Sequence, residues 1–372
     1  MASINSSRLV ASVSLALLTC GLLYLLLWPV DIEPAAWDAP ANPGLVDPFA
    51  ANDRLRKARA INLGEHSGPE DVAGGPDGYL YASTDAGTII RFRPQGRDLS
   101  VFSEPGGRPL GLEFDLRGNL LVANSYFGLQ MIRPDGSVTT LLSEVAGRKI
   151  VAANDLAVAT DGKIYFTESS SKFGTERPGS TYKASRLDIL EHGGHGRVFE
   201  FDPASGEVRT LMQGLNYANG VAISTDQQFL LVVETAHYRV WRYWLRGAKA
   251  GERELILQNL PGFPDNINNG LNERFWIGLI APRNSLLDAV SEFPIARKMI
   301  LRLPRAMQPD AVPSSHVIAV NGDGQVLMNL QDRSASFPSL TGVYETRRYL
   351  FLSSLFGNRI GRLDKKDLVS RL

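Results

Sequence analysis

The chain has almost no cysteine, because Cys20 is the only one among 372 residues. A single cysteine excludes a framework of intramolecular disulfides. Neither charge sign is in excess, with 39 basic and 39 acidic residues, so nothing indicates a nucleic-acid partner. Histidine is scarce as well, with five residues. No Gly–x–Ser–x–Gly sequence accompanies them, which leaves a serine hydrolase mechanism with little support.

Only one apolar run is long enough to cross a membrane. Leu9 to Val30 is uncharged over 22 residues, which makes about 33 Å of helix. Arg8 precedes the run while Asp31 and Glu33 follow it, so the positive-inside rule favours a cytoplasmic N-terminus. A cleaved signal peptide is the alternative. We interpret residues 1–30 as an uncleaved signal anchor, a single-pass transmembrane helix that leaves the remainder on the extracytoplasmic side, in a periplasm, a lumen or the cell exterior.

The rest of the chain has little helical periodicity. Residues 31–52 are rich in proline and alanine and predict a linker or an extended arm over the domain. Beyond them, a turn followed by an apolar strand recurs, and the first large apolar residues after these turns are Leu80, Leu120, Ile164, Phe229, Phe275 and Tyr349. Their intervals are 40, 44, 65, 46 and 74 residues. Because periods near 40 residues are typical of propeller blades, we expect an all-β, six-bladed β-propeller with four-stranded blades over residues 53–372.

Outer strands are also expected in each repeat, with Met299–Leu303 as the third strand of the fifth. Two intervals carry insertions, from Ser169 to His195 and from Pro282 to Lys298. The second predicts a short helix with Asn284 or Ser285 as its N-cap. Both insertions begin after inner strands, so they either lie over the propeller as lids or pack as ordinary loops on its rim.

One position of the repeat carries oxygen-bearing side chains. The residues ten positions before the six strand starts are Glu70, Leu110, Asn154, Asn219, Asp265 and Ser339. Inner strands of a propeller converge on its central channel, so four of these side chains should meet at one mouth, with Asn266 as a further donor. Carboxylate and amide oxygens without thiolate or imidazole favour a hard cation, Ca²⁺ rather than Zn²⁺. The alternative is that these residues simply mark turns.

These stretches resemble a known superfamily. Gly68–Pro69–Glu70–Asp71, Asn154–Asp155, Ala218–Asn219–Gly220 and Pro264–Asp265–Asn266 look like the metal-site motifs of gluconolactonases, paraoxonases and strictosidine-synthase-like proteins. The longer stretches Phe166–Lys172 and Pro282–Asn284 are similar to the strictosidine-synthase-like branch that contains the adipocyte plasma membrane-associated protein. The resemblance covers the chain from Val30 to Leu363.

The resemblance implies a six-bladed propeller and a catalytic Ca²⁺ held by Glu70, Asn154, Asn219, Asp265 and Asn266. It also implies a second, structural Ca²⁺, because Asp71 and Asp155 match paraoxonase residues for such an ion. Leu110 departs from the paraoxonase pattern, which has a histidine there, so we expect an apolar pocket wall instead. His237 follows a strand of the fourth repeat and either reaches the same mouth as part of the pocket wall or is a surface residue.

A Ca²⁺ with a vacant position can polarise an ester or lactone carbonyl. Asp265 can take a proton from the attacking water or serve only as a ligand, and Glu70 and Asn219 complete the expected catalytic set. We therefore expect a membrane-anchored, Ca²⁺-dependent hydrolase of lactones or aryl esters, acting on a small molecule. One alternative is a non-catalytic, Ca²⁺-stabilised extracytoplasmic binding protein. Another is a strictosidine-synthase-type enzyme joining an amine to an aldehyde, for which the sixth repeat offers no carboxylate around Phe337–Leu340.

Overall fold

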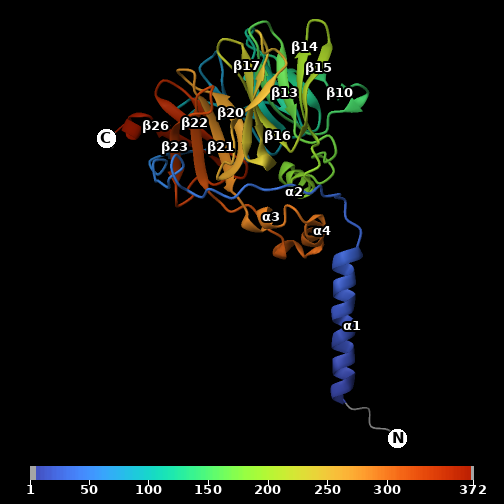
Figure 1. Cartoon of the computed structure of the whole chain (residues 1–372). Helices are drawn as coiled ribbons and strands as arrows, with labels where there is room; N and C mark the ends of the chain where they lie inside the picture. Colours follow the sequence, from blue (N-terminus) through green and yellow to red (C-terminus); the bar gives the residue numbers. More distant parts are fainter. Residues whose placement is uncertain (1–5, 370–372) are drawn as a thin grey trace.

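Antiparallel four-stranded sheets are arranged around a central axis (Figure 1). The structure, a computed structural model, describes residues 6–369. It contains six such sheets, which confirms the predicted six-bladed propeller. In the first five blades the strand nearest the axis comes first and the following strands pair outward in chain order.

The first blade contains β2 (Val72–Gly74), β3 (Leu80–Ser83), β4 (Ile89–Phe92) and β5 (Ser100–Ser103). The second contains β6 (Pro109–Phe114), β7 (Leu120–Asn124), β8 (Gly128–Ile132) and β9 (Val138–Leu142). The third contains β12 (Ala153–Val158), β13 (Ile164–Glu168), β14 (Gly196–Asp202) and β15 (Glu207–Leu215). A hairpin of β10 (Glu144–Val145) and β11 (Arg148–Lys149) lies between the second and third. The fourth blade contains β16 (Ala218–Ile223), β17 (Phe229–Glu234), β18 (Arg239–Trp244) and β19 (Arg253–Leu257). The fifth contains β20 (Gly262–Asn269), β21 (Phe275–Pro282), β22 (Ser315–Val320) and β23 (Val326–Asp332). The sixth contains β24 (Leu340–Glu345), β25 (Tyr349–Ser354), β26 (Arg359–Asp364) and β1 (Arg59–Asn62).

The ring is closed by strands from the two ends of the propeller. β1 pairs antiparallel with β26, so the fourth strand of the sixth blade comes from the start of the propeller. This pairing ties the first blade to the last and covers a sheet edge that would otherwise be free. A short helix, α5 (Lys366–Val369), follows β26.

Each of the six residues used to define the repeat is the first residue of the second strand of its blade, which confirms the period. Met299–Leu303 was expected to be a strand, and this expectation is wrong. Met299 to Arg302 form the last turn of helix α4 (Pro294–Arg302) and Leu303 is its C-cap, while β22 is the third strand of the fifth blade. Pro294 starts the helix in a position that suits proline, and Arg297 and Ile300, three residues apart, are buried on one side of it.

Apolar side chains between neighbouring blades form the core. Trp276, for example, is fully buried in a cluster with Val317, Leu340 and Leu350, which joins the fifth blade to the sixth. The inner strands are buried along nearly their whole length, as in β16 and β17. This packing fixes the inner strand ends, on which the site described below depends.

The N-terminal segment is a long helix followed by an extended arm. Helix α1 (Ser6–Leu27) contains a candidate membrane span, Arg8–Leu27. It ends before the expected apolar run does, because Pro29 follows closely and disfavours helical backbone at the residue before it. The subsequent arm packs on the propeller: Ile32 is fully buried, and the Ala35 amide donates to the Glu191 carbonyl at 2.8 Å. Of the two forms considered for this segment, the structure shows the extended arm.

Both insertions contain helices and cover one face of the propeller (Figure 1). The first forms α2 (Thr181–Glu191). The second extends past its predicted end at Lys298 to the start of β22, and forms α3 (Ser285–Ala289), α4 and a 3₁₀ turn at Arg305–Met307. Asn284 is the N-cap of α3, as predicted, because its side-chain oxygen accepts the amides of Leu286 and Leu287. These helices lie over the face at which the inner strands begin.

Candidate metal and substrate site

The inner strands carry a bulge at the predicted site residues. In β12, Ala153 pairs with Glu168 and Leu156 pairs with Phe166, so the two residues between them stand opposite a single residue of β13. The same shift separates Ala218 from Val221 in β16, and equivalent shifts occur in β6, β20 and β24. A bulge redirects side chains locally. The side chains of consecutive residues such as Asn154 and Asp155 therefore lie in different surroundings.

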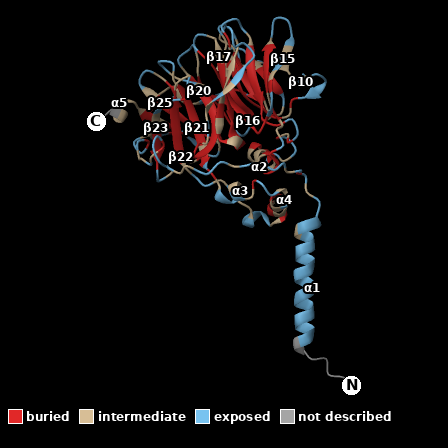
Figure 2. Cartoon of the chain, viewed as in Figure 1, coloured by how far each residue is buried: buried red, intermediate tan, exposed pale blue. Residues whose placement is uncertain are grey.

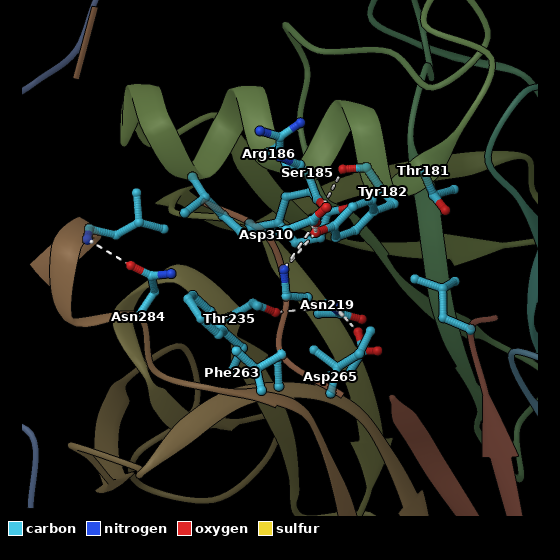
Figure 3. A pocket seen from close by; sticks show the side chains of 18 of the residues that line it. Thr181, Tyr182, Ser185, Arg186, Asn219, Thr235, Phe263, Asp265, Asn284 and Asp310 are labelled. Carbon is cyan, nitrogen blue, oxygen red and sulfur yellow. Dashed lines mark hydrogen bonds between the residues drawn. The ribbon is translucent and has the colours of Figure 1, made fainter. Parts of the chain in front are cut away.

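The predicted residues converge on one cavity. Glu70, Leu110, Asn154, Asn219 and Asp265 all line it. Asn266 is fully buried beside them and donates through Nδ2 to Glu70 Oε1 at 3.0 Å. Figure 3 shows Asn219 and Asp265 on the propeller side of the cavity, opposite residues of α2.

The orientation of two asparagine amides is fixed by hydroxyl groups that directly follow the second strands of their blades. Asn154 Nδ2 donates to Ser169 Oγ at 2.8 Å, and that hydroxyl donates in turn to the Ala218 carbonyl at 2.8 Å. Asn219 Nδ2 donates to Thr235 Oγ1 at 3.1 Å, and this hydroxyl donates to the Pro264 carbonyl at 2.7 Å. Because each hydroxyl proton is used by a carbonyl, the hydroxyl can only accept from the amide nitrogen. The amide oxygens are thereby turned the other way.

Those oxygens have no donor. The buried atoms that accept no hydrogen bond from any described residue include Glu70 Oε2, Asn154 Oδ1, Asn219 Oδ1 and Asn266 Oδ1. Buried polar atoms are rarely left in this state, since each loses its hydration without compensation. Four such oxygens from four of the five predicted ligands therefore require a positively charged or donating partner.

The two carboxylates at this site also lack a cationic partner of their own. Burial, and then the neighbouring charge of Asp265, raise the pKa of Glu70 well above its usual range. Burial raises the pKa of Asp265 to about 7, partly offset by the amide of Asn219, which donates to Asp265 Oδ1. Arg108 lies near Glu70, but its guanidinium donates to the Gly68 carbonyl at 3.1 Å. Two buried carboxylates with few donors favour binding of a cation.

The donor set fits a hard divalent cation. All of its atoms are carboxylate or amide oxygens, the ligands that Ca²⁺ takes. Within residues 6–369 no three His, Cys, Asp or Glu side chains form a group that could hold a metal. That finding counts against a transition-metal site of imidazole and thiolate and leaves a site in which asparagine supplies several donors.

The outer wall of the cavity comes from the insertions. Tyr182, Ser185 and Arg186 of α2 line it, together with Asp310 (Figure 3). Tyr182 OH donates to Asp310 Oδ1, and Arg186 donates to Gln308 Oε1 at 2.7 Å. These bonds tie the first insertion to the second above the predicted ligands, so the helices cover the cavity rather than pack only on the rim.

Asp71 and Asp155, predicted for a second ion, have hydrogen-bond partners of another kind. Asp71 Oδ2 accepts from the Leu112 amide of the next blade at 2.9 Å, and Asp155 Oδ2 accepts from the Val221 amide of the next blade at 2.9 Å. Their Oδ1 atoms accept the amides of their own following residues, Val72 and Leu156, at 2.8 Å. This pattern clamps neighbouring blades together and leaves no orphaned oxygen, so it fits an inter-blade clamp better than an ion site. The second ion remains an expectation from the resemblance.

Two sequence expectations need correction. His237 is not among the described residues that line the cavity. Its Nδ1 donates to Glu234 Oε1 at 2.7 Å, and its Nε2 lies 3.0 Å from His192 Nε2. The ring of His192 stacks on Trp37 of the arm. The arm therefore covers His237 through Trp37, a contact that the repeat pattern of the sequence does not predict.

Ser339 was taken as the sixth repeat position, but the bulge of β24 lies at Thr341 and Gly342. The turn after β24 has two residues fewer than the turn after β12 in the third blade, which shifts the count by two positions. Thr341 Oγ1 donates to the Glu70 carbonyl at 2.6 Å and so holds the backbone of a predicted ligand. Tyr217, which precedes Asn219 by two residues and lines the cavity with a φ of 63°, was also missed.

Comparison with known proteins identifies the family. A family profile described as strictosidine synthase matches residues 154–248, and one described as strictosidine synthase-like, N-terminal, matches residues 47–92. The chain is 31% identical over 383 residues to the adipocyte plasma membrane-associated protein of Gallus gallus, which covers 96% of this chain and 89% of the relative. It is 33% identical over 325 residues to the strictosidine synthase-like 6 protein of Arabidopsis thaliana, with 85% and 84% covered. The chain belongs to the strictosidine-synthase-like family.

Solved structures with a similar fold include a gluconolactonase and a calcium-binding protein. A gluconolactonase from Xanthomonas campestris matches this strictosidine-synthase-like protein with a TM-score of 0.61 at 18% identity, over 90% of this chain and 99% of the other. Regucalcin from Agrobacterium tumefaciens, a calcium-binding protein, matches with a TM-score of 0.56 at 14% identity, over 82% and 92%. At such identities the comparison shows the fold, a gluconolactonase-like propeller. The plasma-membrane-associated relatives and α1 together suggest membrane anchoring of the present chain.

Proposed function

We propose that this strictosidine-synthase-like protein is a membrane-anchored, Ca²⁺-dependent hydrolase of lactones or aryl esters. The observation that supports this most is the set of orphaned buried oxygens of Glu70, Asn154, Asn219 and Asn266 beside the Asp265 carboxylate. Gluconolactonase and calcium-binding neighbours share its fold. Glu70, Asn154, Asn219, Asp265 and Asn266 would hold the ion.

A bound Ca²⁺ would supply a Lewis acid that polarises a substrate carbonyl and stabilises its oxyanion. The amide oxygens of Asn154 and Asn219 are already oriented for such an ion, because the hydroxyls of Ser169 and Thr235 accept from the amide nitrogens. Asp265 Oδ1 accepts from Asn219 Nδ2, and no described donor reaches Asp265 Oδ2. Oδ2 is therefore the atom on which a proton from an attacking water would be received.

The cavity suits a substrate with an apolar group. Its walls include Leu110, Phe263, Ile280 and Leu287, while the predicted ligands form its polar end. An ester or lactone carbonyl would lie at the polar end and the acyl or aryl group would lie along the apolar walls. Helices α2 and α3 contribute Tyr182, Ser185 and Leu287 to the wall above this position.

The strictosidine-synthase-type reaction has less support. It requires a carboxylate from the sixth blade, whereas Leu355 and Phe356 are the residues after β25 that line the described cavity. A non-catalytic, Ca²⁺-stabilised binding protein would use the same oxygens, and only turnover separates it from the hydrolase.

The test is hydrolysis of phenyl acetate and a panel of small lactones by the full chain in detergent micelles. Rates are compared in EDTA and in added Ca²⁺ for the parent, Asn219→Ala and Asp265→Ala. Asn62→Ala, at an exposed asparagine of β1, serves as the matched control. We expect turnover that needs Ca²⁺, is abolished in both site variants and is retained in the control. If Ca²⁺ raises the melting temperature while nothing is hydrolysed, the ion is structural and the binding-protein function replaces the enzyme.

A further inference from the structure

The membrane-span candidate α1 is bound at its C-terminal end to the insertion that covers the cavity. Arg302, the last residue of α4, donates to the carbonyls of Leu25 and Trp28 at 2.6 Å each. Tyr24 OH donates to the Arg302 carbonyl at 3.1 Å. The arginine thus satisfies carbonyls that the end of a helix leaves without partners. Wherever the end of α1 lies, the end of α4 lies within a hydrogen bond of it.

The end of α1 has the features of a membrane boundary. The span Arg8–Leu27 has 20 residues and a mean hydropathy of 2.3, and none of it is buried in the protein. At 1.5 Å per residue it is about 30 Å long, the thickness of the hydrocarbon core. Tyr24 and Trp28 are 44% and 59% exposed, and their rings lie 5.5 Å apart. Aromatic pairs of this kind gather at the interface of a bilayer, which places α4 at the level of the lipid headgroups.

Figure 2 shows exposed stretches of the insertion around α3 and α4, on the side away from the propeller. Phe293 and Ile295, at the start of α4, are 58% and 64% exposed, and Met307, in the 3₁₀ turn after α4, is 65% exposed. At the rim of the cavity, Val312 and Phe356 are 58% and 52% exposed and also line the cavity. Single exposed apolar residues are ordinary. Here four of the five lie on the insertion that is bonded to the end of α1, and the fifth lies at the rim of the cavity that this insertion covers. Such a grouping is typical of a contact surface.

We propose that the α3–α4 insertion rests in the interface of the bilayer crossed by α1, with the mouth of the cavity facing the lipid. The occupant of this apolar surface is then the lipid of that leaflet. The substrate class that follows rests on the proposed hydrolase function. The substrates are lipophilic esters or lactones that partition into the membrane and enter the cavity past Val312 and Phe356.

The docking is tested by spin labels on the full chain in lipid nanodiscs, in a Cys20→Ser background that removes the only native cysteine. One label is placed by Ile295→Cys. The control label is placed by Leu116→Cys, an apolar residue that is 82% exposed. Leu116 follows the end of β6 opposite to Leu110, so it lies on the far face from the cavity. The readout is accessibility to oxygen, which concentrates in lipid, and to a water-soluble nickel chelate.

We expect the label at residue 295 to favour oxygen and the label at residue 116 to favour the nickel chelate. Equal access of the chelate to both labels would overturn the proposal. This measurement needs no turnover, so it judges the docking separately from the proposed hydrolysis.

The substrate class is tested with the double variant Phe293→Asp/Ile295→Asp and the control Leu116→Asp. In nanodiscs, hydrolysis of a long-chain aryl ester should fall about tenfold in the double variant, because charged side chains weaken interfacial binding. Hydrolysis of water-soluble phenyl acetate should stay near the parent rate. A parallel loss on both substrates, or no loss on either, contradicts delivery from the membrane. If the parent hydrolyses neither ester, the proposed function fails and the substrate class fails with it.

Discussion

Replacing Asp265 by asparagine separates the two roles that this residue could have. The substitution preserves shape and one side-chain oxygen but removes the charge and the group that would accept a proton at Oδ2. In the structure, Oδ1 is occupied by the amide of Asn219 and the residue is 7% exposed, so Oδ2 is the oxygen of Asp265 that is left to receive a proton. A general base contributes about 10²–10⁴-fold to rate, equivalent to roughly 3–5 kcal/mol of activation free energy.

The assay follows initial rates of phenyl acetate or lactone hydrolysis as a function of Ca²⁺ concentration. We expect Asp265→Asn to need more Ca²⁺ and, at saturating Ca²⁺, to retain a kcat about 10²-fold or more below the parent. Asp310→Asn is the matched control, because Asp310 lines the same cavity but bonds Tyr182 and Arg305 at its outer rim. If saturating Ca²⁺ restores the parent kcat in Asp265→Asn, Asp265 is only a ligand and the assignment of the base is refuted.

Three further outcomes follow from contacts near the axis. Burial raises the pKa of Glu113 from 4.5 to about 8, so its contribution to folding stability is lost as pH rises between these values. Because glutamine does not titrate, the melting temperature of Glu113→Gln in calorimetric scans should exceed that of the parent increasingly from pH 4 to pH 8, by about 4 °C at pH 8. A Cβ at Gly220 would lie 2.2 Å from the Ile267 amide nitrogen, so Gly220→Ala should lower the free energy of unfolding by about 3 kcal/mol. A Cβ at Gly21 would have no atom within 4 Å, so Gly21→Ala should leave this free energy unchanged. Asp155→Ala orphans the Val221 and Leu156 amides and should lower the urea-unfolding free energy by about 3 kcal/mol; an unchanged value would contradict the clamp.

Much of the propeller was predictable because its signal is periodic. Each blade repeats a turn followed by an apolar strand, and insertions change the spacing without changing that local pattern. Met299–Leu303 shows the limit of the method. Its short apolar run suits either a strand or the end of a helix, and only burial of Arg297 and Ile300 on one side decides for the helix.

The site was predictable up to the point where a bulge intervenes. Counting ten residues back placed Glu70, Asn154, Asn219 and Asp265 around one cavity, as the structure does. The same count selected Ser339 instead of Thr341, because one shorter turn shifts the register and no residue pattern announces it.

Contacts between distant segments could not be predicted at all. The partner of His192 and His237 is Trp37 of the N-terminal arm, and the hydroxyls that orient the asparagines come from neighbouring strands. Such contacts depend on how the segments pack in three dimensions, which a single repeat does not encode.

Calorimetric titration of the chelator-treated full chain with Ca²⁺ tests the central claim, that the orphaned oxygens hold a cation. The parent and Asn62→Ala should bind Ca²⁺ with the same affinity. Asn154→Ala and Asn219→Ala should each weaken binding about tenfold or more, because each removes one of the five predicted ligands. A parent that binds no Ca²⁺, or site variants that bind it as tightly as the parent, would contradict the account.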